Sequence, residues 1–156
     1  FNITFNGGSY LAFLDGLDQE NFTLTMFEDV LDGASGNDDL IGGFGDDTLT
    51  GGTGDDTFLY ESIGDGHDVI TDFFDGADTI DLDELFDALN TDGTHDGKYD
   101  PGAERTDALN FGVDGGGNLV LTIDDTENGD FEHFSITFQG LDSTDEIAVM
   151  AAIVTE

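Results

Sequence analysis

Residues 33–59 decide the fold of this chain. They read GASGNDDLI, GGFGDDTLT and GGTGDDTFL, which are three consecutive copies of one nine-residue pattern. The pattern is G-G-x-G-x-D-x-U-x, where U is a large apolar residue. Glycine at positions one, two and four is expected to take a positive φ, so that the chain turns sharply and points its carbonyls inward. The glycines of these turns are Gly33, Gly36, Gly42, Gly43, Gly45, Gly51, Gly52 and Gly54.

Position six of each copy supplies a carboxylate, from Asp38, Asp47 and Asp56. Carboxylates and main-chain carbonyls are hard oxygen ligands, which suit calcium better than zinc or copper. Because successive turns alternate sides, each ion is expected to lie between one turn and the next but one. The repeats therefore predict several calcium ions, with the three aspartates and the glycine turns as their ligands.

Positions seven to nine of each copy predict a short strand. Leu40, Leu49 and Phe58 occupy position eight and are expected to point into a thin core. A disordered segment rich in Gly and Asp would not return its apolar residue at the same place in every copy. The sequence therefore predicts an all-β protein built on a right-handed parallel β-roll.

The period can be followed before the clean copies. Asp29 lies nine residues before Asp38, which predicts a degenerate first turn over residues 24–32 with Asp29 as a further ligand. Residues 1–31 also alternate between apolar and polar residues, as strands do. They are expected to form two or three strands that cap the roll or finish a preceding domain.

The period also continues after the clean copies. Following a short insertion at residues 60–62, residues 63–71 and 73–81 keep part of the pattern. Their position-six residues, Asp68 and Asp78, are predicted to be weaker calcium ligands. Their position-eight residues are expected to stack under those of the preceding copies; these residues are Ile70 and Ile80, under Leu49 and Phe58.

A helix and a long loop are expected after the roll. Residues 81–84 read as a capping box, which opens a helix that ends at about Leu89. Its apolar face is expected to consist of Leu82, Leu85, Phe86 and Leu89. Residues 90–107 are polar and rich in glycine, and their spaced aspartates resemble a calcium loop only loosely.

The end of the chain predicts a small antiparallel sheet and a closing helix. Strands are expected at 108–113, 118–123 and 131–138. A second capping box at 143–146 precedes the closing helix. The stripe of this helix is expected to contain Ile147, Met150, Ala151 and Val154.

Acidic residues dominate the composition, since Asp and Glu number 37 against two basic residues, for a net charge of −35. Such a chain repels itself and resists compaction unless cations neutralise it. Nucleic acid and anionic membrane surfaces are poor partners for this charge. The sequence has no cysteine, which excludes disulfides and thiol chemistry. No apolar run reaches membrane-spanning length, so no membrane insertion is expected.

The length of 156 residues suits one domain, which the sequence divides into three parts. Residues 1–31 are the N-terminal strands, residues 32–81 the roll, and residues 82–156 a β-rich C-terminal region. The chain begins at Phe1 without the basic and apolar segments of a signal peptide. It is therefore expected to be a piece of a longer polypeptide.

The nonapeptides resemble the calcium-binding β-roll repeats of RTX proteins, also called hemolysin-type repeats. The layout of residues 33–156 further resembles the C-terminal target domain of type I secretion substrates in Gram-negative bacteria. The stretches that carry this second resemblance are DTFLYESIGDGHDVITDF (56–73), DTIDLDELF (78–86) and ITFQGLD (136–142).

The resemblance implies that the chain is exported unfolded by a type I secretion exporter, its expected partner, and folds on extracellular calcium. Its expected location is secreted, extracellular or on the cell surface. In this family the module is attached to proteases, lipases, adhesins, S-layer proteins and alginate epimerases, so no activity is implied. Residues 1–31 lie outside the resemblance, and Ala34 breaks the first Gly-Gly pair.

No catalytic constellation is found. His67, His95 and His133 are scattered, no HExxH or GxSxG motif occurs, and carboxylates are too abundant to indicate glycosidase chemistry. The chain is expected not to be an enzyme. Two functions stay open: an export and stabilising module of an adhesin or S-layer protein, or an accessory module of a secreted enzyme with a possible polysaccharide contact. The number of ions, the attached protein and the oligomeric state also stay open.

Overall fold

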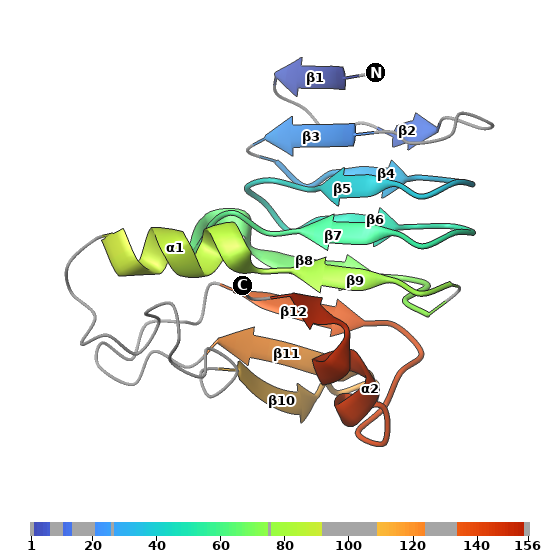
Figure 1. Ribbon diagram of the computed structural model, residues 1–156, viewed down its shortest axis with the longest axis vertical. Coiled ribbons are helices and arrows are strands. Elements are labelled where there is room, and N and C mark those ends of the chain that lie inside the picture. Colours follow the sequence, from blue (N-terminus) through green and yellow to red (C-terminus); the bar gives the residue numbers. More distant parts are fainter. Residues whose placement is uncertain are drawn as a thin grey trace.

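Short strands alternate between two sheets, so that the chain coils into a parallel roll around a thin core (Figure 1). The computed structural model describes residues 2–6, 11–13, 21–25, 27–74, 76–91, 109–123 and 134–154. One sheet has the order β1 (Asn2–Asn6), β3 (Asn21–Thr25), β5 (Asp39–Ile41), β7 (Thr57–Leu59), β9 (Thr79–Asp81) and β13 (Ile153–Val154). The other has the order β10 (Leu109–Val113), β11 (Leu119–Ile123), β12 (Ser135–Phe138), β8 (His67–Ile70), β6 (Thr48–Thr50), β4 (Val30–Asp32) and β2 (Leu11–Phe13).

The position-eight residues stack through parallel pairing between alternate turns. Leu40 lies opposite Phe58, and Phe58 lies opposite Ile80. Leu49 lies opposite Ile70 in the other sheet. All five side chains are buried, which confirms the predicted thin core and the predicted stacking of Ile70 and Ile80.

The roll extends to the N-terminal side of the clean repeats. β1 runs parallel to β3, and β2 runs parallel to β4. In β4 the buried Leu31 lies opposite Leu49, which confirms that residues 24–32 end in a strand of the roll. The same two sheets therefore continue across the predicted boundary at residue 31, and the division into three parts stays a prediction. Residues 7–10 and 14–20 of this N-terminal part lie outside the described residues.

The predicted helix after the roll is present as α1 (Asp83–Thr91), which projects from the side of the stack (Figure 1). Leu82, Leu85 and Phe86 are fully buried, as the apolar stripe predicts. The Asp81 side chain accepts a hydrogen bond of 3.0 Å from the backbone N–H of Asp83. The predicted loop at 90–107 falls almost wholly outside the described residues. None of the described helices is long and apolar enough to cross a membrane.

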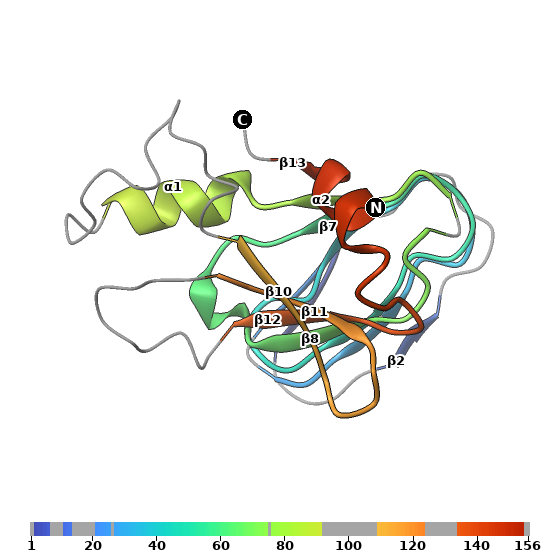
Figure 2. The ribbon, with the colours of Figure 1, turned by 90° about the horizontal axis from the view of Figure 1, so that it is seen from below.

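The C-terminal strands join the roll rather than form a separate sheet. β10 and β11 form the predicted antiparallel hairpin, and β12 adds to it antiparallel. β12 also pairs parallel with β8, so that Phe138 lies opposite Ile70. Figure 2 shows these strands lying across the C-terminal end of the roll. They cover the apolar end of the stack, because Leu119, Leu121, Ile136 and Phe138 are buried there.

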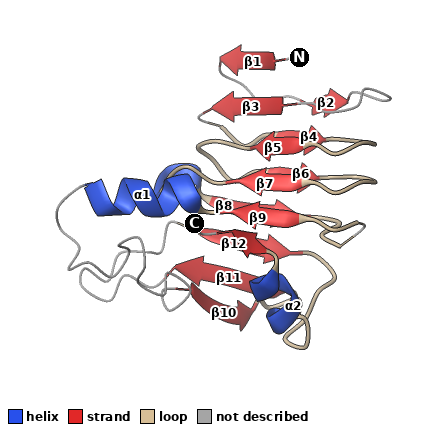
Figure 3. Ribbon diagram, viewed as in Figure 1, coloured by secondary structure: helices blue, strands red, loops and turns tan. Residues whose placement is uncertain are grey.

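The closing helix differs from its prediction. It is the short helix α2 (Glu146–Ala151) in Figure 3. Its N-cap Asp145 makes no side-chain capping hydrogen bond. The predicted capping box at 143–146 is therefore wrong. The predicted stripe is confirmed for Met150, which packs against the core, but it is wrong for Ala151 and for Ile147, which is 85% exposed, and it misses the buried Val149. The helix ends at Ala151 because residues 153–154 leave it to pair with β9 as β13.

Candidate functional site

Six buried aspartates lie at the starts of the successive strands β4 to β9, five of them directly before the strand and Asp68 within β8. We call Asp29, Asp47 and Asp68 the first column, and Asp38, Asp56 and Asp78 the second column. In both columns the Oδ1 atom of one aspartate accepts a hydrogen bond from the backbone N–H of the aspartate before it. The N–H···Oδ1 distances are 2.8 Å for Asp29–Asp47, 2.9 Å for Asp47–Asp68, 3.0 Å for Asp38–Asp56 and 3.1 Å for Asp56–Asp78.

The second carboxylate oxygen has a different environment. The Oδ2 atoms of Asp47, Asp56 and Asp68 are buried and find no hydrogen-bond partner among the described residues. Burial raises the pKa of Asp47 and of Asp56 to about 6, although hydrogen bonds from the backbone oppose the rise. A buried carboxylate with one unsatisfied oxygen and no positive neighbour is costly, and a divalent cation would remove that cost. The observed oxygens therefore suit the predicted calcium ion.

The glycines of the turns play two different roles. Positions two and four take a positive φ, as predicted: Gly43 has 89° and Gly45 has 140°. The first repeat has Ala34 at position two with a φ of 68°, a conformation that favours glycine. Position one was predicted to take a positive φ as well, and that prediction is wrong for Gly33, Gly42 and Gly51.

Position one needs glycine for the carboxylate rather than for the turn. A Cβ atom added to Gly33 would come within 2.7 Å of Asp38 Oδ2. At Gly42 and Gly51 the added Cβ would overlap the Oδ2 atoms of Asp47 and Asp56. The missing side chain therefore makes the space in which the Oδ2 atom lies.

Position five was not predicted to contribute, yet it repeats the ladder on the exposed side of each turn. Asn37 Oδ1 accepts a hydrogen bond of 3.1 Å from the N–H of Asp55. Asp46 accepts one of 3.0 Å from His67, and Asp55 one of 3.1 Å from Ala77. The sequence signal was available, because a short side chain with an acceptor oxygen recurs at this position in the three clean copies.

Asp72 is a further residue that the sequence did not indicate. Its Oδ1 atom accepts a hydrogen bond of 3.0 Å from the N–H of Gly51, and its Oδ2 atom accepts one of 2.8 Å from Gly52. The carboxylate thus caps the turn of the third repeat from the next turn but one. Since Asp72 lies outside the nonapeptide pattern, only the coiling of the chain brings it to this turn.

The two predicted weaker ligands are placed differently. Asp78 uses both oxygens, because Oδ1 bonds Asp56 and Oδ2 accepts a hydrogen bond of 2.9 Å from Phe74 N–H. In Asp68 only Oδ1 is bonded, and burial, helped by the charge of Asp47, raises its pKa to about 8. Asp68 therefore has a buried oxygen to offer, whereas that of Asp78 is already engaged. The choice of ligands stays a prediction for every residue named.

The predicted ligand set combines one carboxylate per turn with main-chain carbonyls. Within the part of the chain that the structure describes, no three side chains of His, Asp or Glu converge as a metal-binding cluster. His67 is exposed, and its Nδ1 atom lies 3.0 Å from Ser135 Oγ. His95 and His133 lie outside the described residues.

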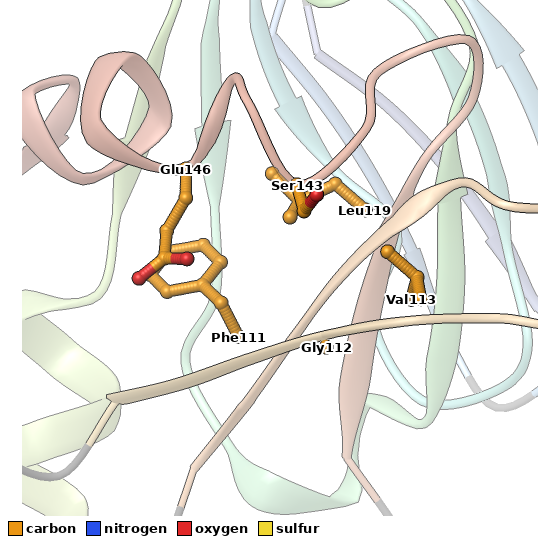
Figure 4. Close-up of a pocket in the computed structure, with 6 residues that line it drawn as sticks. All are labelled: Phe111, Gly112, Val113, Leu119, Ser143 and Glu146. Carbon is orange, nitrogen blue, oxygen red and sulfur yellow. The ribbon is translucent and has the colours of Figure 1, made fainter.

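Hollows elsewhere are small or open. Figure 4 shows one of about 120 Å³ between β10 and α2, where Glu146 lies over the ring of Phe111. A second, open groove of about 470 Å³ follows the outer face of β10, β11 and β12. Its polar lining includes Asn110, Thr122, Ser135 and Thr137.

The comparisons agree with this geometry. Residues 26–59 match the family described as the RTX calcium-binding nonapeptide repeat, in four copies. The match begins at residue 26, within the degenerate turn, so it extends beyond the three clean copies. No curated protein matches the chain.

Among solved structures, the chain is similar to the AlgE6R3 subunit from the Azotobacter vinelandii mannuronan C5-epimerase. The TM-score is 0.55 at 24% sequence identity, and the match covers 96% of this chain and 85% of that one. This likeness concerns the fold, which is a β-roll in both chains.

Proposed function

We propose that this chain, which carries RTX calcium-binding repeats, is a non-catalytic module that folds on extracellular calcium. It belongs to a larger secreted or surface protein of the adhesin or S-layer type, and residues 82–156 carry its type I secretion signal. One observation supports the calcium step above all. The buried Oδ2 atoms of Asp47, Asp56 and Asp68 have no partner among the described residues, and those of Asp47 and Asp56 lie where a position-one glycine leaves room.

Charge couples calcium to folding. The chain carries a net charge of −35, and the roll gathers carboxylates into two buried columns. Extracellular calcium modules have dissociation constants of roughly 10⁻⁴–10⁻³ M. At about ten times that constant each ion adds about 1.4 kcal/mol to folding, so a few ions supply several kcal/mol. The ion-free chain is then unfolded, which is the form that an exporter can thread.

Circular dichroism of the full chain tests the calcium step. In chelator we expect little β signal, and on addition of calcium to about 1 mM we expect a cooperative gain. Magnesium is the matched control, since it prefers a tighter octahedral shell and keeps its waters. A roll that is fully folded in chelator would contradict the proposal.

A secretion assay tests the targeting step separately. A reporter fused before Phe1 should appear uncleaved in the medium when a type I exporter is co-expressed. Removal of residues 82–156 should keep it inside the cell. A triple variant, D38N, D47N and D56N, should still be exported but fail to fold outside, because it loses only the calcium step. Export that is unchanged by the deletion would refute the targeting role.

A second function is favoured by the open groove on the outer face of β10, β11 and β12. Its amide and hydroxyl lining could contact a polysaccharide, as an accessory module of a secreted protease, lipase or alginate epimerase would. The similar fold belongs to a subunit of a mannuronan epimerase. Calorimetry with mannuronan and a neutral glucan would detect this function, and Thr122→Lys should abolish the binding. A catalytic signature upstream of Phe1 would also favour this function over the adhesin.

A further inference from the structure

Tyr60 lies at the end of the first column, in the insertion that interrupts the repeats. Its side chain is only 2% exposed, and its ring meets that of Phe134 edge-on at 5.4 Å. The hydroxyl finds no hydrogen-bond partner among the described residues. Such a buried hydroxyl costs stability unless something satisfies it.

The charged group that acts most strongly on Tyr60 is Asp68, whose Oδ2 atom is also buried and without a partner in the described part of the chain. Burial above all, then the charge of Asp68 and a side-chain hydrogen-bonding contact with it, raises the pKa of Tyr60. That contact is weak, because neither the hydroxyl nor Asp68 Oδ2 makes a hydrogen bond of ordinary geometry among the described residues. A cation bound beside Asp68 would draw that carboxylate toward itself. The Tyr60 hydroxyl could then donate a hydrogen bond to the carboxylate.

The turn of Asp68 is also built unlike the clean repeats. In those, a glycine at position one makes room for Oδ2. Here that position is Ile63, which opens a 3₁₀ helix (Ile63–Asp65) instead. Asp65 holds this helix in place, since its Oδ2 atom accepts hydrogen bonds from Glu61 and Ser62. The insertion thus replaces a glycine by a structured turn that brings in Tyr60.

Asp68 is moreover the last carboxylate of its column. The next strand, β12, places Ile136 opposite it. Among the described residues, a cation between Asp47 and Asp68 therefore has no further aspartate of the column beyond it. Tyr60 is a polar group of the same turn, and it interacts with the Asp68 side chain.

We propose that Tyr60 is a positioning residue for the last calcium ion of the first column: its hydroxyl donates a hydrogen bond to Asp68 and fixes that carboxylate for the ion. This inference rests on the proposed calcium-dependent function. It makes the site at Asp68 different in kind from the sites at the clean repeats. Tyr60 also packs on Phe134, which directly precedes β12. Through Tyr60, the ion therefore helps to hold β12 in place.

Terbium luminescence tests the proximity. Terbium takes calcium sites and emits when an adjacent tyrosine is excited, and the chain has three tyrosines and no tryptophan. Tyr60→Phe should lose most of the sensitised emission. Tyr10→Phe and Tyr99→Phe, the matched controls, should keep it. Emission that survives Tyr60→Phe would overturn the inference.

Calcium calorimetry tests the positioning role. Tyr60→Phe keeps the ring on Phe134 and should weaken one class of sites about tenfold, the cost of one hydrogen bond to a charged group. In an Asp68→Asn background the same change should alter affinity less than about twofold, because the partner is gone. Unchanged affinity in Tyr60→Phe would overturn the inference and leave the proposed function standing. No calcium binding by the unaltered chain would overturn both.

Discussion

Asp47, Asp56 and Asp68 each divide their two oxygens between two tasks. In Asp56, Oδ1 ties the turn to Asp38 two turns earlier, while Oδ2 lies buried against Gly51. An asparagine could keep the first contact through its own oxygen but would bring no charge to the second. The carboxylate is therefore required by the ion rather than by the fold alone.

Asp56→Asn should raise the calcium concentration needed for folding several-fold, because it removes one charged ligand and keeps the hydrogen bond to Asp38. The midpoint of the circular-dichroism titration measures this shift. Asp55→Asn is the matched control, since Asn37 already fills the same place in an earlier repeat. Equal shifts in the two variants would show that the effect is one of net charge only.

Ala34→Gly should stabilise the roll. Ala34 has a φ of 68°, where an L side chain costs roughly 1 kcal/mol relative to glycine. We expect a gain of about 1 kcal/mol in urea unfolding at saturating calcium. Ser35→Gly, one residue later and without a positive φ, should give no gain. A loss of stability in Ala34→Gly would contradict the argument from backbone strain.

At the scale of elements, pairing across the sheet decides where the last helix ends. The hydrophobic pattern of residues 147–154 fits a helix of greater length. β9 offers an open edge, however, and residues 153–154 satisfy their backbone groups there. The helix therefore stops early, and the side chain that faces the core is that of Val149.

Val149→Ala should lower the free energy of unfolding by about 2 kcal/mol, because it removes a fully buried branched side chain. Ile147→Ala should change it by less than about 0.5 kcal/mol, since that side chain is 85% exposed. Urea unfolding at saturating calcium measures both. A larger loss of stability in Ile147→Ala than in Val149→Ala would instead support the helix stripe that the sequence predicts.

Over the whole molecule, the buried carboxylates predict an unusual dependence on pH. Their ordinary pKa is 3.8, and in the folded chain burial raises that of Asp47 to about 6 and that of Asp68 to about 8. The protonated form therefore favours the fold when calcium is absent. This stability is fully present below about pH 3.8 and is lost as pH rises through about 6 and about 8.

In calcium-free buffer we accordingly expect the β signal to grow as the pH falls from about 8 to about 4. With calcium present the ion competes with the proton, so the calcium midpoint should rise in acid. Circular dichroism over this range measures both trends. A triple variant, D47N, D56N and D68N, should respond less to pH in calcium-free buffer. A β signal that falls on acidification would contradict the expected sign.

The sequence by itself determined the roll. A period of nine places a glycine turn, a carboxylate and an apolar residue at fixed intervals, and each of these is a local requirement. Leu40, Leu49 and Phe58 are buried where the period predicts. The apolar spacing of Leu82, Leu85 and Phe86 likewise determined α1.

Only the tertiary structure decided which atoms of those residues are engaged. Coiling alone brings Asp72 to the turn at Gly51 and Tyr60 to Asp68. The fold also places the Asp56 carboxylate in the space that a side chain at position 51 would fill, and it pairs β12 with β8. The contact of Asp72 with Gly51 spans 21 residues and the pairing of β12 with β8 spans more, and a local pattern holds no information about partners at that separation. The physical reason is that the period fixes the shape of one turn, whereas the packing of one turn on another fixes what each oxygen meets.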